Sequence, residues 1–390
     1  MRWSRAHSPA VLAAMLLACA ACCAQAPSAV ASPAAVWQPV ETAVRDAHGR
    51  VPASPPMALF GQDATGRQVF ALELAGFDRA KPLPVASASK LVSALVLLRL
   101  VDRGTLSLDA TTAQVLGWDG ASGAISLRQL LAQVSGLAPN EPCMNRSDTT
   151  LAVCVDAIRQ RATTPAHPPG AHFDYGGSHF HVAARMAEVA AGRSWNRLFE
   201  DEWRKPLGLA PATRFQTAPW LGGNAEESTN PRPAGGLVAS ADDYMRLLGV
   251  AFGLPGSARH VNAQAAATER WTRTDLFDEL ATEPHPTASV GGSPMARASG
   301  KPMRYGLGVW LECVPARRPC PVVSSAGAFG WTPWFDREAG YFALLAMYRL
   351  PERGAAAMPV VADAVLLQQQ IKPLIVQALA AQRAVAPAPR

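Results

Sequence analysis

A serine and a lysine stand three residues apart at the start of a strongly apolar segment. Ser87 and Lys90 open SASKLVSALVLLRLVD, residues 87–102, which lacks glycine and proline and is predicted to form a buried helix. On a helix this spacing places both side chains on one face. Burial and the helix macrodipole both lower the pKa of such a lysine, so its neutral amine can accept a proton from the serine. The pair predicts a nucleophile with its base; the alternative is a chance pairing at a helix end.

A second candidate is Tyr175, which lies in the glycine-rich segment PPGAHFDYGGSHF, residues 168–180. A tyrosine near a serine and a lysine can shuttle a proton if cationic neighbours lower its pKa. The alternative is a core tyrosine whose hydroxyl is hydrogen-bonded.

A third candidate is SSAGAFG, residues 324–330, a run of small residues inside a predicted strand. Small residues let a substrate lie against the strand, and a free strand N–H can point at a developing oxyanion. A bulge, or tight packing against a helix, is the alternative.

Metal sites and common nucleotide motifs are not indicated. Two histidines in an H-x-H pattern diverge on a helix, and no H-E-x-x-H motif or acidic cluster accompanies the four histidines of this region. These are His167, His172, His179 and His181. The sequence also lacks a G-x-S-x-G elbow, a P-loop and G-x-G-x-x-G. We expect neither a metal nor another cofactor.

The cysteines favour two disulfides. Three of the seven lie near the N-terminus, and the others form the local pairs Cys143 with Cys154 and Cys313 with Cys320. An even number at short spacing in an exported protein favours disulfides, and zinc fits the C-x₁₀-C and C-x₆-C spacings poorly.

The N-terminus has the pattern of an export signal. Two arginines precede an apolar run, and AVA at residues 29–31 is a small-residue cleavage site, so residues 1–31 are predicted to be a signal peptide. The segment LLAC, ending at Cys19, also resembles a bacterial lipoprotein box, which would make Cys19 a lipid anchor. We therefore expect a periplasmic or secreted protein, or an outer-membrane lipoprotein.

Composition indicates a folded protein and gives no sign of nucleic-acid binding. Of 390 residues, 49% are hydrophobic and 17% charged, which disfavours disorder and permits one large core or two modest ones. The net charge of +6 falls to +4 without Arg2 and Arg5, and no basic cluster indicates nucleic-acid binding.

The predicted elements place strands at both ends of the chain. A hairpin is expected at 57–76, three strands within 304–314, 322–336 and 340–350, a loop at 282–303, and a last helix at 359–383. Intervening helices are predicted at 126–133, 179–191, 195–204 and 241–252, the last one capped by Ser240. This order predicts an α/β (α+β) fold: an antiparallel sheet flanked by helices, built from about 38–106 and 300–385, with an inserted helical part at about 107–290. Residues 32–390 would form one catalytic domain.

Together and in order, these segments resemble the serine β-lactamase and penicillin-binding-protein superfamily over about residues 40–380. They are closest to class C β-lactamase-like esterases and peptidases. Ser87 and Lys90 match the S-x-x-K motif, and PGAHFDYGG, residues 169–177, resembles P-G-x-x-F-x-Y-S-N. Three further segments resemble family patterns: LRQLLAQVSGL at 127–137 (with Gln133 at a common histidine position), NPRPAGGLVASADDYMRLL at 230–248, and YGLGVW at 305–310.

The resemblance implies covalent acyl transfer on a β-lactamase/transpeptidase-like fold. Ser87 would attack a carbonyl, Lys90 and Tyr175 would move the proton, and the N–H groups of Ser87 and Ala328 would form the oxyanion hole. Water would then hydrolyse the acyl-enzyme.

Two departures from the family pattern point to the substrate. Gly177 replaces the asparagine that holds an acylamino group in β-lactamases, and Ser325-Ala326-Gly327 replaces K-T-G, which removes the cation facing a carboxylate. Losing such a charged partner costs about 1.5–3 kcal/mol. A small ester or uncharged amide therefore fits better than penicillin, although an arginine from elsewhere would restore the charge. D-amino-acid peptidase or amidase, β-lactamase and a non-hydrolytic penicillin-binding or sensor-like domain remain alternatives.

Overall fold

The computed structural model of the 390-residue chain describes residues 33–51, 55–162, 167–221, 228–252, 274–313, 317–351 and 358–385. The predicted signal peptide, with Cys19, lies outside these ranges. Within them, no helix combines the length and apolar character needed to cross a membrane.

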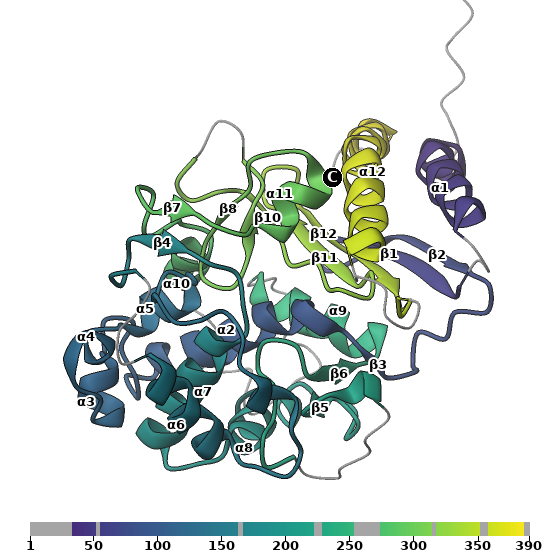
Figure 1. Ribbon diagram of the computed structural model, residues 1–390. Coiled ribbons are helices and arrows are strands. Elements are labelled where there is room, and N and C mark those ends of the chain that lie inside the picture. Colours follow the sequence, from purple (N-terminus) through teal and green to yellow (C-terminus); the bar gives the residue numbers. More distant parts are fainter. Residues whose placement is uncertain are drawn as a thin grey trace, which may run out of the picture.

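A seven-stranded antiparallel sheet forms one layer of the molecule (Figure 1). The hairpin predicted at 57–76 is confirmed, and its two strands are joined by a turn at 64–67. The order across the sheet is β2 (Gln68–Leu74), β1 (Met57–Asp63), β12 (Tyr341–Met347), β11 (Thr332–Asp336), β10 (Val322–Ser324), β9 (Trp310–Leu311) and β8 (Arg304–Tyr305). The first and last parts of the chain therefore meet where β1 pairs with β12.

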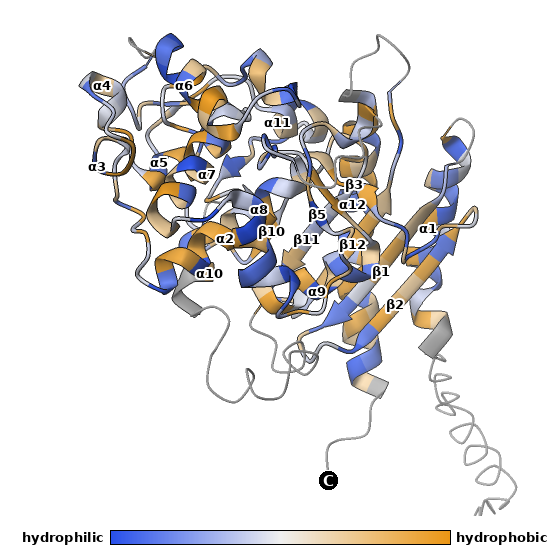
Figure 2. Cartoon of the chain, turned by 90° about the horizontal axis from the view of Figure 1, so that it is seen from below, coloured by the Kyte–Doolittle hydropathy of each residue, from blue (hydrophilic) through white to orange (hydrophobic). Residues whose placement is uncertain are grey.

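The central strand β12 is buried on both faces, and its side chains alternate between two cores. Ala343 and Leu345 point to the core formed with α1 (Pro33–Arg50) and α12 (Met358–Val385). Phe342 and Leu344 point to the larger core on the opposite face. Figure 1 shows α1 and α12 side by side on one side of the sheet, and Figure 2 shows hydrophobic residues along β1 and β2.

The chain between β2 and β8 is mainly helical. Its helices are α2 (Ser89–Asp102), α3 (Thr112–Leu116), α4 (Gly120–Gly123), α5 (Leu127–Leu131), α6 (Leu151–Arg161), α7 (Ser178–Ala191), α8 (Trp195–Phe199), α9 (Ala241–Ala251), α10 (Thr274–Leu280) and α11 (Pro294–Ser299). A π-helical turn, Glu200–Arg204, extends α8. Ser240 caps α9 as predicted, accepting a hydrogen bond from the N–H of Asp243.

The described part of this region also contains five short strands. The strands β3 (Leu83–Pro84), β6 (Leu237–Ala239) and β5 (Arg214–Phe215) form a small antiparallel sheet. The strands β4 (His172–Phe173) and β7 (Ser289–Val290) form a parallel pair.

The helix α2 lies at the centre of the molecule. Every residue from Ser89 to Leu100 is buried, as expected for a helix that is apolar on all sides. In Figure 1 it runs between the helical region and the sheet. A side chain at its start is therefore held rigidly and shielded from water.

Three predictions of secondary structure are wrong in detail. The predicted strand at 322–336 is two strands, β10 and β11, which pair with each other, so most of the small-residue run at 324–330 lies in the turn between them. The predicted strand at 304–314 is a tight hairpin of β8 and β9, in which Arg304 pairs with Leu311. Its turn contains Gly308 at φ 85°, where a Cβ atom would lie 2.9 Å from the carbonyl oxygen of Lys90. The expected loop at 282–303 contains β7 and α11. The helix α1 lies before the first predicted element and is an additional finding.

Candidate active site

Ser87 lies in a single 3₁₀ turn, Ala86–Ala88, and Lys90 in the first turn of α2. The Nζ of Lys90 donates a hydrogen bond to the Oγ of Ser87 at 3.2 Å and another to the carbonyl of Ala234 at 3.0 Å. Ala86 precedes the serine with φ 48°, a left-handed conformation that costs an alanine about 1–2 kcal/mol. Strain of this kind persists where the surroundings enforce it, and here Val85 is tied to Leu237 by a 3.0 Å backbone hydrogen bond.

The segment before β6 forms the back wall of this site. The Oγ of Ser93 donates to the carbonyl of Pro233 at 2.7 Å, and the Oγ of Ser89 accepts from the N–H of Leu237 at 3.0 Å. These contacts fix the start of α2, which aims Lys90 at Ser87. The segment at 230–248 thus lies next to Ser87 and Lys90.

Lys90 is only 3% exposed, and burial lowers the pKa of its ammonium well below the usual range. The positive charge of Arg232 lowers the Lys90 pKa further. Burial also lowers the pKa of Arg232, to about 10, so this guanidinium stays charged at neutral pH. The guanidinium of Arg232 is therefore a permanent cation beside an amine whose neutral form is favoured by burial.

Tyr175 is next to both residues. Its hydroxyl is hydrogen-bonded to the Ser87 side chain, and the Nζ of Lys90 lies 4.5 Å from the centre of its ring. The ring stacks on Trp310 at 5.1 Å and meets Tyr305 edge-on at 5.9 Å. The expected lowering of the Tyr175 pKa does not occur: burial outweighs the hydrogen bond and raises it to about 12. Tyr175 is therefore protonated at neutral pH and suited to donate a proton.

Gln133 holds the tyrosine loop in place. Its backbone carbonyl accepts from the N–H of Asp174 at 3.0 Å, and its side-chain oxygen accepts from the N–H of Gly176 at 2.6 Å. Sequence reasoning noted Gln133 only as a departure from a histidine, and missed this role because the contact spans 43 residues.

The small residues after β10 lie directly against Ser87 and Val85. The Oγ of Ser325 donates to the carbonyl of Ser87 at 3.4 Å. A Cβ atom on Gly327 would lie 2.2 Å from the carbonyl oxygen of Val85, so only glycine fits there. The N–H of Ala328 has no acceptor among the described residues. The third candidate segment is thus brought to Ser87, with one N–H available for an oxyanion.

At the position where the family pattern has an asparagine, the space is already filled. A Cβ atom on Gly177 would lie 3.2 Å from the sulfur of Met144. The N–H of Gly177 donates to the side-chain oxygen of Asn140 at 3.2 Å, and Asn140 lines the site. An amide side chain is therefore present, but it comes from a different loop, which sequence spacing could not indicate.

Ser87, Tyr175 and Ala328 line two adjoining cavities. The arginine lobe, of about 200 Å³, is completed chiefly by Asn140, Trp220, Arg232 and Phe329. The methionine lobe, of about 410 Å³, is completed chiefly by Met295, Arg297, Trp310 and Ala326. Ser87 thus lies where two spaces meet, an arrangement that can hold two groups of one bound molecule on either side of it.

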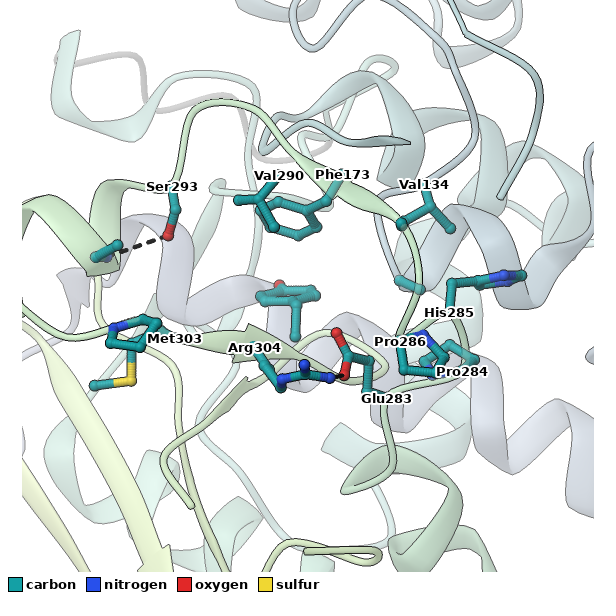
Figure 3. A pocket seen from close by; sticks show the side chains of 15 residues that line it. Val134, Phe173, Glu283, Pro284, His285, Pro286, Val290, Ser293, Met303 and Arg304 are labelled. Carbon is teal, nitrogen blue, oxygen red and sulfur yellow. Dashed lines mark hydrogen bonds and ion pairs between the residues drawn. The ribbon is translucent and has the colours of Figure 1, made fainter. Parts of the chain in front are cut away.

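A third cavity, of about 290 Å³, lies apart from this chemistry (Figure 3). It is apolar, with Phe173, Val290 and Met303 in its wall and the Glu283–Arg304 ion pair beside them. Tyr305 also lines it. Neither Ser87 nor Lys90 does, so it is not where acyl transfer would take place.

Two of the four histidines that were considered as metal ligands are hydrogen-bonded to other groups of the protein. His179 lies between the Oγ of Ser135 at 2.7 Å and the carbonyl of Asp174 at 2.8 Å. His181 contacts the carbonyl of Gly177 at 3.2 Å. Among the described residues no group of three or more metal-ligating side chains converges.

Both predicted disulfides are present. Cys143 and Cys154 are joined with their Cα atoms 5.4 Å apart, and Cys313 and Cys320 with theirs 5.8 Å apart. The first disulfide anchors the loop that carries Asn140 and Asn145.

Comparison with known proteins identifies the family. The Beta-lactamase family model matches residues 64–366, most of the chain. The chain belongs to the Beta-lactamase family. The resemblance inferred from the motifs is thereby confirmed at the family level, as is the β-lactamase/transpeptidase fold.

The relatives within the Beta-lactamase family differ in their described activities. Penicillin-binding protein 4 of Amycolatopsis lactamdurans is 31% identical over 54% of this chain and 55% of its own length. Thus the chain spans about half the length of that relative, and 28% of the protein flp of Staphylococcus aureus. A candidate β-lactamase from Bacteroides dorei shares the fold with a TM-score of 0.71, at 24% identity over 87% of this chain and 98% of its own.

EstCE1, a hydrolase with promiscuous acyltransferase activity, also shares the fold, with a TM-score of 0.60. Its identity is 18% over 86% of this chain and 99% of its own. The proteins similar to this chain thus include a penicillin-binding protein and a hydrolase. The fold alone therefore does not indicate the activity of this chain, which has to be inferred from the residues of its site.

Proposed function

We propose that this protein is an exported serine hydrolase that forms an acyl-enzyme on Ser87 and acts on small carboxylic esters. The observation that carries the proposal is the 3.2 Å contact between the Lys90 amine and the Ser87 hydroxyl in a buried site that favours the neutral amine. A serine hydroxyl is a weak nucleophile without such a base.

In the proposed reaction, Ser87 attacks the ester carbonyl while Lys90 accepts its proton. The oxyanion receives hydrogen bonds from the N–H groups of Ser87 and Ala328. The C–O bond then breaks, and the departing alkoxide takes the proton of Tyr175, which regains one from Lys90. Water hydrolyses the acyl-enzyme with Lys90 again as base.

The substrate preference rests on the residues that replace the family's polar groups. Ser325 supplies no cation at the position of the family's lysine, and Gly177 supplies no side chain at the position of its asparagine, so a β-lactam or peptide is not held by the groups that the family pattern uses. The likeness to EstCE1, a hydrolase with promiscuous acyltransferase activity, supports hydrolysis and acyl transfer as chemistries that this fold accommodates. Export is supported by the N-terminal pattern and by the two disulfides, which persist in oxidising compartments.

A substrate panel tests this proposal. Purified protein is assayed with p-nitrophenyl esters, D-Ala-terminated peptides and a chromogenic cephalosporin, with Ser87→Ala as the blank. We expect turnover of the esters that is lost in Ser87→Ala, and at least tenfold lower kcat/KM for the other two classes. Faster peptide or cephalosporin turnover would replace the proposal with peptidase or β-lactamase activity. Acylation without turnover would indicate a binding domain.

A further inference from the structure

The arginine lobe contains a positive charge without a counterion. Arg232 is partly buried and lines the same cavity as Ser87, and no carboxylate pairs with it among the described residues. Among the same residues, no acidic side chain lines the lobe. Charges that are largely removed from water are normally paired in proteins, so a guanidinium left without an anion in a cleft is a feature that the fold alone does not explain.

The hydrogen-bonding capacity of Arg232 is mostly unused. Only its Nη1 finds an acceptor among the described residues, the side-chain oxygen of Asn145, and its Nε is buried without a partner. The Cζ atom of Arg232 lies over the Trp220 ring, 5.1 Å from the ring centre. This cation–π contact restrains the guanidinium, whose remaining N–H groups suit the two-point binding of a carboxylate.

Two aromatic rings bound the space next to this charge. Trp220 and Phe329 lie 5.8 Å apart, centre to centre, and both line the lobe. The lobe therefore offers apolar walls leading to a cation. A short hydrocarbon chain that ends in an anion matches both features.

We propose that Arg232 binds a carboxylate of the substrate, so that the preferred esters are monoesters of short dicarboxylic acids or similar anionic esters. This inference rests on the proposed acyl transfer at Ser87. It places the recognition of the anion on the segment before β6, away from Ser325, where the family pattern would have its cation. Arg232 is thus a specificity residue for the same reaction.

The test compares two esters of the same size and leaving group. One is the p-nitrophenyl monoester of glutaric acid, and the other is p-nitrophenyl 5-methylhexanoate, in which an isopropyl group replaces the carboxylate. We expect the wild type to favour the anionic ester by about 10- to 100-fold in kcat/KM, because a charged hydrogen bond in a closed site is at stake. Arg232→Met should reduce that ratio to about one, and Arg232→Lys should restore part of it.

Arg297 provides the matched control, because it is an arginine lining the methionine lobe on the other side of Ser87. Arg297→Met should retain the preference for the anionic ester. A ratio near one in the wild type, or a preference that survives Arg232→Met, overturns the inference. Loss of the preference in Arg297→Met but not in Arg232→Met also overturns the inference.

A binding measurement separates this inference from the proposed reaction. Titration calorimetry on Ser87→Ala, which cannot be acylated at this residue, compares the affinities for the two esters. Tighter binding of the anionic ester that disappears in Ser87→Ala/Arg232→Met supports Arg232 even if the wild type hydrolyses nothing. Equal affinities for the two esters overturn the role of Arg232, even if the wild type turns over neutral esters.

Discussion

The side-chain oxygen of Gln133 accepts a 2.6 Å hydrogen bond from the N–H of Gly176. The backbone carbonyl of Gln133 accepts from Asp174 at 3.0 Å, so one residue holds the chain on both sides of Tyr175. Gln133 itself adopts φ 57°, a conformation that is unfavourable for a non-glycine residue. Gln133, a strained residue, thus supports Tyr175, a proposed catalytic group that lies far from it in the sequence.

Gln133→Ala should lower kcat on a neutral ester by about 10- to 100-fold, since small displacements of a catalytic group carry costs of this size. The expected signature is non-additivity. If Gln133 acts only through Tyr175, the double variant Gln133→Ala/Tyr175→Phe should be no slower than Tyr175→Phe alone. Steady-state kinetics of the three variants measure this. Additive losses would mean that Gln133 has another function.

Gly327→Ala should destabilise the protein and impair catalysis. The new methyl group would meet the Val85 carbonyl, and relieving that overlap costs about 1–3 kcal/mol in free energy of unfolding. The shift would also displace Ala328. Gly49→Ala is the matched control: nothing lies within 4 Å of its Cβ position in α1. Urea unfolding and ester kinetics test the pair, and equal stabilities of the two variants would contradict the packing argument.

Arg232→Met should move the acid limb of the pH profile to higher pH. Activity needs neutral Lys90, and the charge of Arg232 lowers the Lys90 pKa. Removing that charge raises the pKa, so a higher pH is needed to deprotonate the amine. The nearby His179 and His181, with pKa values lowered to about 4 and about 3, are uncharged and contribute no compensating change. The profile of kcat/KM for a neutral ester measures the shift; an unmoved or acid-shifted limb contradicts this coupling.

The same two histidines should make the fold acid-sensitive. Both are fully buried, and desolvation lowers their pKa values from 6.5. Below pH 6.5 the unfolded chain binds protons that the folded protein excludes, so stability falls as the pH drops. The expected loss between pH 7 and pH 5 is about 2 kcal/mol per histidine. Urea unfolding at both pH values tests this, and His179→Gln should reduce the difference by about half.

Local patterns account for what the sequence predicts correctly. The spacing of Ser87 and Lys90, the apolar run to Asp102 and the cysteine pairs are all contained in short segments. Helix periodicity and disulfide spacing act over such distances, so the proximity of Ser87 to Lys90 and the two disulfides are accessible without a structure.

Contacts across the fold account for what the sequence does not predict. Arg232 lies in the segment before β6, and the pairing of β6 with β3 brings that segment next to Ser87. Asn140 comes from another loop, and its side-chain oxygen accepts a hydrogen bond from the N–H of Gly177. The turn at Gly308 divides a predicted strand because it packs against Lys90. The direction of the Tyr175 pKa likewise depends on burial, which no spacing rule reveals.

The most direct test of the central claim is intact-mass spectrometry after incubation with a fluorophosphonate. We predict a single adduct on the wild type that is absent from Ser87→Ala and forms much more slowly on Lys90→Ala, with circular dichroism confirming that both variants are folded. No adduct on folded wild type, or an adduct that persists in Ser87→Ala, would contradict Ser87 as the activated nucleophile.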